Sequence, residues 1–387
     1  MWGNDILVLR NDLIAFAWSA PMRDLAAKLD LSDVGLRKLL ARCGVTPPPQ
    51  GYWNKVRAGK PVPEPPKAPP RRPGETGRLS VDKRFARVLS PAAPLPSDGP
   101  FASTLVPEDV DELYAKELQA LGSVSAPKTL DRPHKGLVQL LKKEQQRREK
   151  FAASCWSWDQ PRLDTPLDKR RLRILNAVFL ALAKRGHDGD AYEDREEIHA
   201  RAIVGNTYMG VDITIVGKHQ TVLVHGYKRP APGLPPSTPL ALQLNIDFDR
   251  KTIVSWQDDD QGKLEAKIAE IAAGIIVAGE KKFRRGLREA EERARQRQLE
   301  LEKRRHEQLA QLNRERLQNL KMSGELLRQA QDIRALVEQV RQAIDAGAVD
   351  VEVPTLEAWQ RWALAEADRI DPVRSGQIMS HLSEPSI

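Results

Sequence analysis

The sequence predicts a multidomain, mainly α chain with one central α+β domain. The chain has 387 residues, of which 5% are aromatic and 29% are charged, and this composition argues against one large hydrophobic core. Prolines gather between residues 61 and 100. The alternation of apolar and polar residues that is typical of strands is confined to residues 211–256.

Composition divides the chain into six parts. They are a helix-turn-helix-like bundle over residues 1–60, a Pro-rich linker over 61–108, a polar helical segment over 109–160, the α+β domain over 161–279, a long charged helix over 280–346, and a Trp-bearing helix with a tail over 351–387. Because proline cannot donate a backbone hydrogen bond, we expect the linker to be a stiff, extended and solvated spacer.

The N-terminal part predicts a helical hairpin over residues 22–42. Its leucines and Ala26 have the spacing that two short helices need to share a core across a tight turn. Ser32 is a natural N-cap for the second helix, and Asp30 takes the turn position where glycine is usual. The second helix presents Arg37, Lys38 and Arg42 outward, as a recognition helix does toward the major groove.

A segment rich in aromatic and basic residues follows the hairpin. Pro47 to Pro49 end the helix and extend the chain. We expect Trp53 to close the small helical core and the basic residues after it to contact phosphates. The predicted DNA-binding residues of the whole module are Ser32, Arg37, Lys38, Arg42, Lys55, Arg57 and Lys60.

Residues 13–60 resemble the N-terminal module of a large family of uncharacterised bacterial proteins. The matching positions are Leu13, Trp18, Ser19, Pro21 and Met22, then Ser32, Asp33, Val34 and Leu36, then Pro48, Pro49, Gly51, Tyr52, Trp53, Lys55, Gly59 and Lys60. The stretch WQRWALAEADRIDP near the C-terminus is also similar to the tail of such proteins. The resemblance implies a helix-turn-helix-like DNA-binding module joined to a domain of unknown role.

The central domain is predicted to be a helix, a set of strands and a second helix. The first helix begins at Thr165 and Pro166 and ends at Gly186, where a left-handed residue is needed. Strands are expected at 211–215, 221–227, 240–248 and 253–256, with turns between them. A helix from Lys263 should cover one face of this antiparallel sheet.

The same helix should continue from Lys281 as a long charged segment. Phe283, Leu287, Ala290 and Leu301 approximate a heptad seam, but arginines interrupt it. Two interpretations stay open: a solvated helix stabilised by Glu–Arg pairs, or a helix that packs against another helix or a second copy in a homodimer.

Charge and cysteine content restrict the partners and the compartment. The net charge of +8 and the isoelectric point near 9.4 favour a polyanion, with nucleic acid as the first candidate and a membrane surface as the second. The N-terminus has no secretory signal pattern, and no apolar run reaches the roughly 18 residues of a spanning helix. Cys43 and Cys155 predict two reduced thiols in a cytoplasmic protein without metal or cofactor.

Catalytic signals are weak. Asp212 with Asp249 and Lys251 could assemble a Mg²⁺ site, but residues 249–252 also read as a hairpin turn. The favoured hypothesis is a non-enzymatic protein that binds duplex DNA. The alternatives are a metal-dependent nuclease or another DNA-processing component of a mobile-element or defence system, and a helical scaffold that recruits a partner through Trp359 and Trp362.

Overall fold

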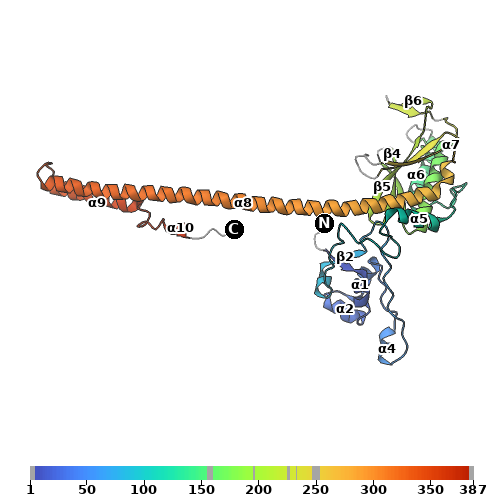
Figure 1. Cartoon of the computed structure of the whole chain (residues 1–387), viewed down its shortest axis with the longest axis horizontal. Helices are drawn as coiled ribbons and strands as arrows, with labels where there is room; N and C mark the ends of the chain where they lie inside the picture. The colour runs from blue at the N-terminus through green and yellow to red at the C-terminus, as the bar shows by residue number, and fades with distance from the viewer. Residues whose placement is uncertain are drawn as a thin grey trace. The chain divides into compact units, whose positions relative to one another are not determined.

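A computed structural model describes residues 5–154, 160–194, 197–224, 227–231, 233–245 and 253–382 (Figure 1). The chain divides into two compact units, residues 1–291 and 292–387. The first unit contains two separate hydrophobic cores, one in an N-terminal module and one in an α+β domain. The prediction of a multidomain chain that mixes helices with an antiparallel sheet is confirmed.

The N-terminal module is built from short helices around a leucine core. Its elements are β1 (Asp5–Leu9), α1 (Arg10–Ala17), α2 (Met22–Lys28), α3 (Asp33–Arg42) and α4 (Tyr52–Arg57). Its fully buried leucines are Leu13, Leu25, Leu29, Leu36 and Leu40. The helical spacing of these leucines brings them to one side of each helix, where they meet.

Residues 78–89 correct the interpretation of 61–108 as a solvated spacer. Strand β2 (Arg78–Asp82) pairs antiparallel with β1, and Val81 is buried in the core of the module. The 3-10 helix η1 (Lys83–Arg87) inserts Phe85 against Phe16, with ring centroids 5.9 Å apart and an edge-to-face arrangement. The apolar pattern of β2 is too short to predict a strand by itself. Its partner strand lies about 70 residues earlier in the chain, so the pairing does not follow from the local sequence either.

Residues 71–77 are also fixed rather than solvated. Arg71 donates hydrogen bonds of 2.8 and 3.1 Å to the two carboxylate oxygens of Glu280, which is fully buried. The backbone N–H of Gly74 donates to the same carboxylate at 2.8 Å. Gly74 has a φ of +75°, and a Cβ there would lie 2.2 Å from the carbonyl oxygen of Val204, so only glycine fits.

The α+β domain has one five-stranded antiparallel sheet with the order β3-β4-β5-β8-β9. Its strands are β3 (Asp188–Asp194), β4 (Glu197–Val204), β5 (Thr207–Ile215), β8 (Leu240–Asn245) and β9 (Ile253–Gln257), and β6 (Thr221–Val224) pairs with β7 (Tyr227–Pro230) in a separate hairpin. Strands are present at the predicted positions near 211, 240 and 253, whereas β3 and β4 were not predicted. The single strand expected at 221–227 is instead divided between β6 and β7, and residues 225 and 226 lie outside the described residues. Residues 246–248 of the expected third strand lie outside the described residues.

Two helices pack on one face of this sheet. Helix α7 (Pro166–Lys184) begins where predicted, because the Thr165 hydroxyl accepts a hydrogen bond of 3.1 Å from the Asp168 N–H. Gly186 ends it with a φ of +80°, as expected. The first turns of α8 (Ile268–Asp345) follow the short η3 (Leu264–Ala266) and bury Ile268, Ile271 and Ile275 in the same core.

Two further helices complete the domain. They are α5 (Val110–Leu121) and α6 (Lys135–Ser154), within the predicted polar helical segment. Glu117 of α5 is buried and accepts a hydrogen bond of 2.6 Å from Arg185. At the start of α6, the His134 N–H donates to the Asn176 side chain at 2.7 Å. These polar contacts attach both helices to α7 and to the turn that follows it.

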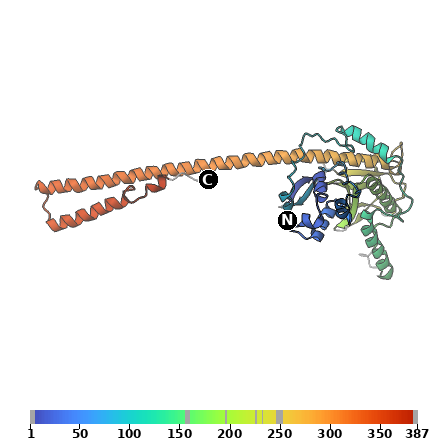
Figure 2. The same cartoon turned by 90° about the horizontal axis from the view of Figure 1, so that it is seen from below.

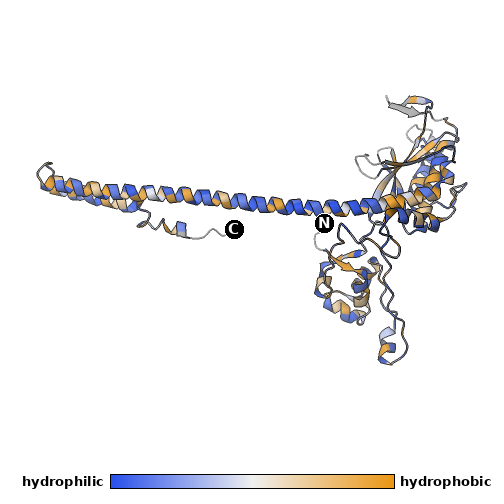
Figure 3. Ribbon diagram, in the orientation of Figure 1, coloured by the Kyte–Doolittle hydropathy of each residue, from blue (hydrophilic) through white to orange (hydrophobic). Residues whose placement is uncertain are grey.

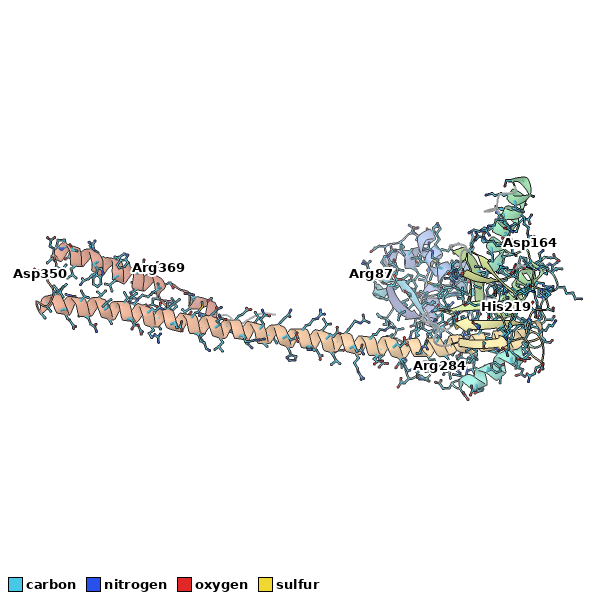
Figure 4. The ribbon with its side chains drawn as sticks, turned by 90° about the horizontal axis from the view of Figure 1, so that it is seen from above. Arg87, Asp164, His219, Arg284, Asp350 and Arg369 are labelled. Carbon is cyan, nitrogen blue, oxygen red and sulfur yellow. The ribbon has the colours of Figure 1, made fainter. Side chains whose placement is uncertain are left out.

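The second unit is an antiparallel helical hairpin of α8 and α9 (Val353–Ile370), followed by α10 (Met379–Leu382) (Figure 2). The buried α8 residues Ser323, Ala330 and Val337 lie seven positions apart, which is the period of a coiled-coil seam. Ala330 and Val337 face α9, where Ala363 and Ala367 are buried, whereas the Ser323 hydroxyl lies 2.8 Å from Nε2 of His381 in α10. Figure 4 labels Asp350 in the turn between the helices and Arg369 near the end of α9.

Polar residues dominate the part of α8 before this seam (Figure 3). Leu301, which the sequence placed on a heptad seam, is 65% exposed within the chain, and Phe283 is buried in the first unit. The intramolecular seam therefore lies later in the helix than predicted. Among the described residues, no helix combines the length and the apolar character that crossing a membrane requires.

We expect Glu280→Gln to destabilise the first unit by about 3 kcal/mol, because it leaves the Arg71 guanidinium without its counter-charge in a buried site. Urea unfolding followed by circular dichroism measures this loss. Limited proteolysis should also cut residues 71–77 faster in the variant. Glu64→Gln, an exposed change of the same charge in the Pro-rich segment, is the control, and equal stabilities of the two variants would contradict the role of the ion pair.

We expect a pH-dependent stability term from His187, whose pKa burial lowers to about 4. Because the unfolded histidine titrates near its ordinary pKa of 6.5, the unfolded state binds more protons between these two values, and stability falls as the pH falls through this window. The loss between pH 7 and pH 5 is about 2 kcal/mol. Urea titrations at both pH values should show that His187→Gln reduces this difference; an unchanged difference would exclude His187 as its source.

Candidate nucleic-acid interface

The turn between α2 and α3 has the geometry that a compact helical hairpin needs. Asp30 adopts a left-handed φ of +53°, at the position where glycine is usual. The Leu31 N–H then donates to the Ala26 carbonyl at 3.0 Å and closes the end of α2. The Asp30 carboxylate forms an ion pair with Arg87 of η1, so the turn is attached to the segment that completes the module.

Helix α3 has one buried face and one basic face. Leu36 and Leu40 are fully buried, whereas Arg37, Lys38 and Arg42 are exposed. Val34 lies on this exposed side in the first turn and is 55% exposed. The structure thus places the three predicted basic residues of α3 on one solvent-facing surface.

Ser32 has a local structural role. Its side-chain oxygen accepts a hydrogen bond of 3.0 Å from the Gly35 N–H, which makes it the N-cap of α3, as expected. The residue is exposed at the end of the helix. Its hydroxyl proton can still be donated to a phosphate, because the cap uses the oxygen only as an acceptor.

The segment after α3 ends in a short helix that was not predicted from the sequence. Helix α4 begins after Gly51, and Figure 1 shows it beyond α1 and α2 as seen from β2. The Tyr52 ring packs edge-to-face on Trp18 with centroids 5.2 Å apart, and the Trp18 Nε1–H donates to the Thr46 carbonyl at 3.0 Å. These contacts attach α4 to the end of α1.

Trp53 does not close the core as predicted. It is half-buried, and the ring it contacts is that of Tyr52, at 5.2 Å between centroids. Tyr52 is the aromatic residue that reaches the module, through Trp18. Two adjacent residues of a helix point about 100° apart, so only one of the pair can face Trp18 squarely.

The predicted basic residues of the α4 segment are all on the surface. Lys55 and Arg57 lie on α4, Lys60 follows it, and all three are exposed. Lys55 and Arg57 occupy the last turn of this short helix, where cations are favoured.

Most other arginines of the first unit form an ion pair with a carboxylate, whereas the cations of α3 and α4 form none among the described residues. Arg147 pairs with Glu193, Arg185 with Glu117 and Arg201 with Asp190. Within the described ranges, no ion pair with an acidic side chain is formed by the six cations of α3 and α4, which are Arg37, Lys38, Arg42, Lys55, Arg57 and Lys60. Their charge is therefore available to an external anion.

Most of the net charge of the chain lies in its first third. Residues 1–108 contain 16 Lys and Arg and 10 Asp and Glu, which is +6 of the total +8. Residues 161–279 contain 16 of each and are neutral. The attraction for polyanions that the composition predicts is thus a property of the N-terminal module and the segment that completes it.

Cys43 is a free thiol at the end of α3. Burial raises the pKa of its thiol, and the nearby charge of Arg10 only partly opposes this effect. Arg10 also donates to the Cys43 carbonyl at 3.2 Å, so this residue helps to connect α1 with the end of α3. Cys155 lies outside the described residues.

The residues proposed for a metal site are not assembled in the described part of the chain. Asp212 accepts a hydrogen bond of 2.5 Å from the Asn245 side chain, and Asp249 and Lys251 lie outside the described residues. Asp258 accepts from the Leu264 N–H and from Arg170. No group of three or more His, Cys, Asp or Glu side chains among the described residues is arranged to hold a metal ion.

Comparison of the chain with models of known protein families, with curated proteins and with solved structures finds no match. The resemblance of residues 13–60 to a bacterial module therefore stays a sequence-based expectation.

Proposed function

We propose that the protein is a non-enzymatic DNA-binding protein that contacts duplex DNA through its N-terminal module. One observation carries the proposal: the six cations of α3 and α4 are exposed and have no carboxylate partner among the described residues, while the charged residues of the α+β domain balance. Cations without intramolecular partners can neutralise phosphates and release counterions at no cost in internal ion pairs.

The two helices have different roles in this proposal. Helix α3 enters the major groove with its exposed face, where Arg37 and Lys38 reach base edges or flanking phosphates. Helix α4 and Lys60 contact the backbone beside it and fix the orientation of the module. A cytoplasmic location, which the predicted reduced thiols favour, is part of the proposal.

Of the residues in the nuclease hypothesis, only Asp212 lies in the described part of the chain. Nothing in that part favours a nuclease over DNA binding alone.

Self-association has a specific observation in its favour. Leu317 and Leu320 of α8 are 53% and 52% exposed, within a unit whose buried seam consists mainly of small side chains. We propose that a second copy covers these leucines in a homodimer, because pairing would remove apolar surface from water.

Reversing two charges on α3 should abolish most of the DNA affinity. We expect Arg37→Glu with Lys38→Glu to weaken binding to a mixed-sequence duplex about tenfold or more and to lower the salt slope by about 2, one for each lost phosphate contact. Fluorescence anisotropy between about 50 and 200 mM salt measures both quantities.

The matched control reverses Lys142 and Lys143, which are also adjacent, basic and exposed but lie on α6. This control should leave the affinity and the salt slope close to those of the unmodified protein. If the α3 and α6 double variants bind equally well, the proposed interface is wrong. Affinity that does not depend on salt would contradict phosphate contacts altogether.

Replacing the two exposed leucines by charged residues should prevent self-association. We expect Leu317→Glu with Leu320→Glu to shift the mass measured by multi-angle light scattering from dimer to monomer, since carboxylates in an apolar contact are strongly unfavourable. Gln318→Glu with Asn319→Glu adds the same charge in the same turn of α8 and should keep the dimer. A monomeric mass for the unmodified protein would refute the homodimer.

A further inference from the structure

A cavity of about 300 Å³ lies between the N-terminal module and the α+β domain, apart from α3 and α4. The segment 69–79 forms much of its wall, Arg10 contributes from the start of α1, and Asn206 contributes from the turn between β4 and β5. We call this cavity the arginine pocket, because four arginines line it: Arg10, Arg71, Arg72 and Arg78.

Among the described residues, an acidic partner is found for only one of the four guanidinium groups. Arg71 is paired with the buried Glu280, as described above. The other three have carbonyl partners: Arg10 donates to Cys43 at 3.2 Å, Arg72 to Gly186 at 3.4 Å, and Arg78 to Ala93 at 2.5 Å. A carbonyl oxygen orients a guanidinium group but does not cancel its charge.

The charge of the pocket identifies the kind of ligand that would complete it. Glu75 is the one acidic residue in its lining, and no ion pair of its side chain is found among the described residues. Three unneutralised guanidinium groups and one carboxylate leave a net charge of +2. A dianion balances this charge, and guanidinium groups bind phosphoryl oxygens with paired, directional hydrogen bonds.

The pocket also has neutral polar groups and sufficient size. The Asn206 side chain is exposed at its edge and can donate or accept a hydrogen bond. A volume of about 300 Å³ is at the lower end of the range for small-molecule sites. This combination suits a small molecule with one phosphoryl group and hydroxyl groups beside it.

We propose that the arginine pocket binds the dianionic phosphoryl group of a small phosphorylated molecule. Arg10, Arg72 and Arg78 hold the phosphoryl oxygens, and Asn206 contacts the remainder of the ligand. Since Arg10 and Arg78 belong to the N-terminal module and Asn206 belongs to the α+β domain, the ligand links the two and stabilises them together. The proposal does not depend on DNA binding, because none of its residues lies on α3 or α4.

Calorimetric titration of the full chain with inorganic phosphate, pyrophosphate and adenosine monophosphate at constant ionic strength tests the proposal. We expect saturable binding of at least one of these probes, accompanied by a rise in melting temperature that chloride does not produce. Arg72→Gln, a change at an exposed side chain, should weaken the binding at least tenfold. Glu75→Gln should strengthen it severalfold, because it removes the repelling carboxylate, and misfolding cannot produce a gain of affinity.

Arg57→Gln makes the same charge change on α4 and should leave the affinity for the small anions unchanged. The proposal is overturned if none of the three probes binds saturably, if Arg57→Gln weakens binding as much as Arg72→Gln does, or if Glu75→Gln fails to strengthen it. A short DNA duplex should not displace the bound phosphate. Displacement by the duplex would overturn the assignment to a small molecule and would assign the pocket to the nucleic-acid backbone.

Discussion

The carboxylate of Glu280 is fully buried, and it accepts hydrogen bonds from Arg71, Arg284 and the backbone N–H of Gly74. Burial raises the pKa of this carboxyl group, but the hydrogen bonds outweigh burial and hold the pKa below its ordinary value. The contact fixes residues 71–77 against α8, immediately before the strand that completes the N-terminal module. The position of β2, and with it the closure of the first core, therefore depends on one ionised side chain in a separate domain.

The elements that the sequence predicted are those stabilised by their own local pattern. Helix α7 has a capping threonine and a leucine stripe, and β8 has a leucine at every second position from Leu240 to Leu244. Strand β3 was missed because its sequence, DGDAYED, has few residues that favour strands. Its position follows from tertiary packing: a Cβ on Gly189 would lie 2.3 Å from the Phe179 ring, so the missing side chain is what lets α7 approach the strand.

The sequence predicted which residues form the candidate interface. It did not predict which of their charges lack an intramolecular ion pair. Helical periodicity places Lys38 and Arg42 opposite Leu36 and Leu40 and Arg37 at the edge of their face, and this much follows from spacing alone. Pairing does not follow from spacing, because the partners of arginines such as Arg71 and Arg185 are distant in sequence. The arginine pocket was not predicted for the same reason, because its lining residues come from α1, the proline segment and the β4–β5 turn, which are distant in sequence.

The pairing of β1 with β2 has a consequence for synthesis of the chain. The partners Ile6 and Val81 are separated by the whole helical hairpin and the first part of the Pro-rich segment. At a translation rate of about 5–20 residues per second, β1 waits roughly 4–15 seconds after its own synthesis before its partner is made. During this interval its edge has unpaired backbone groups beside the apolar Val8. Proline-rich sequence between the two strands gives the nascent chain little opportunity to form a competing strand there.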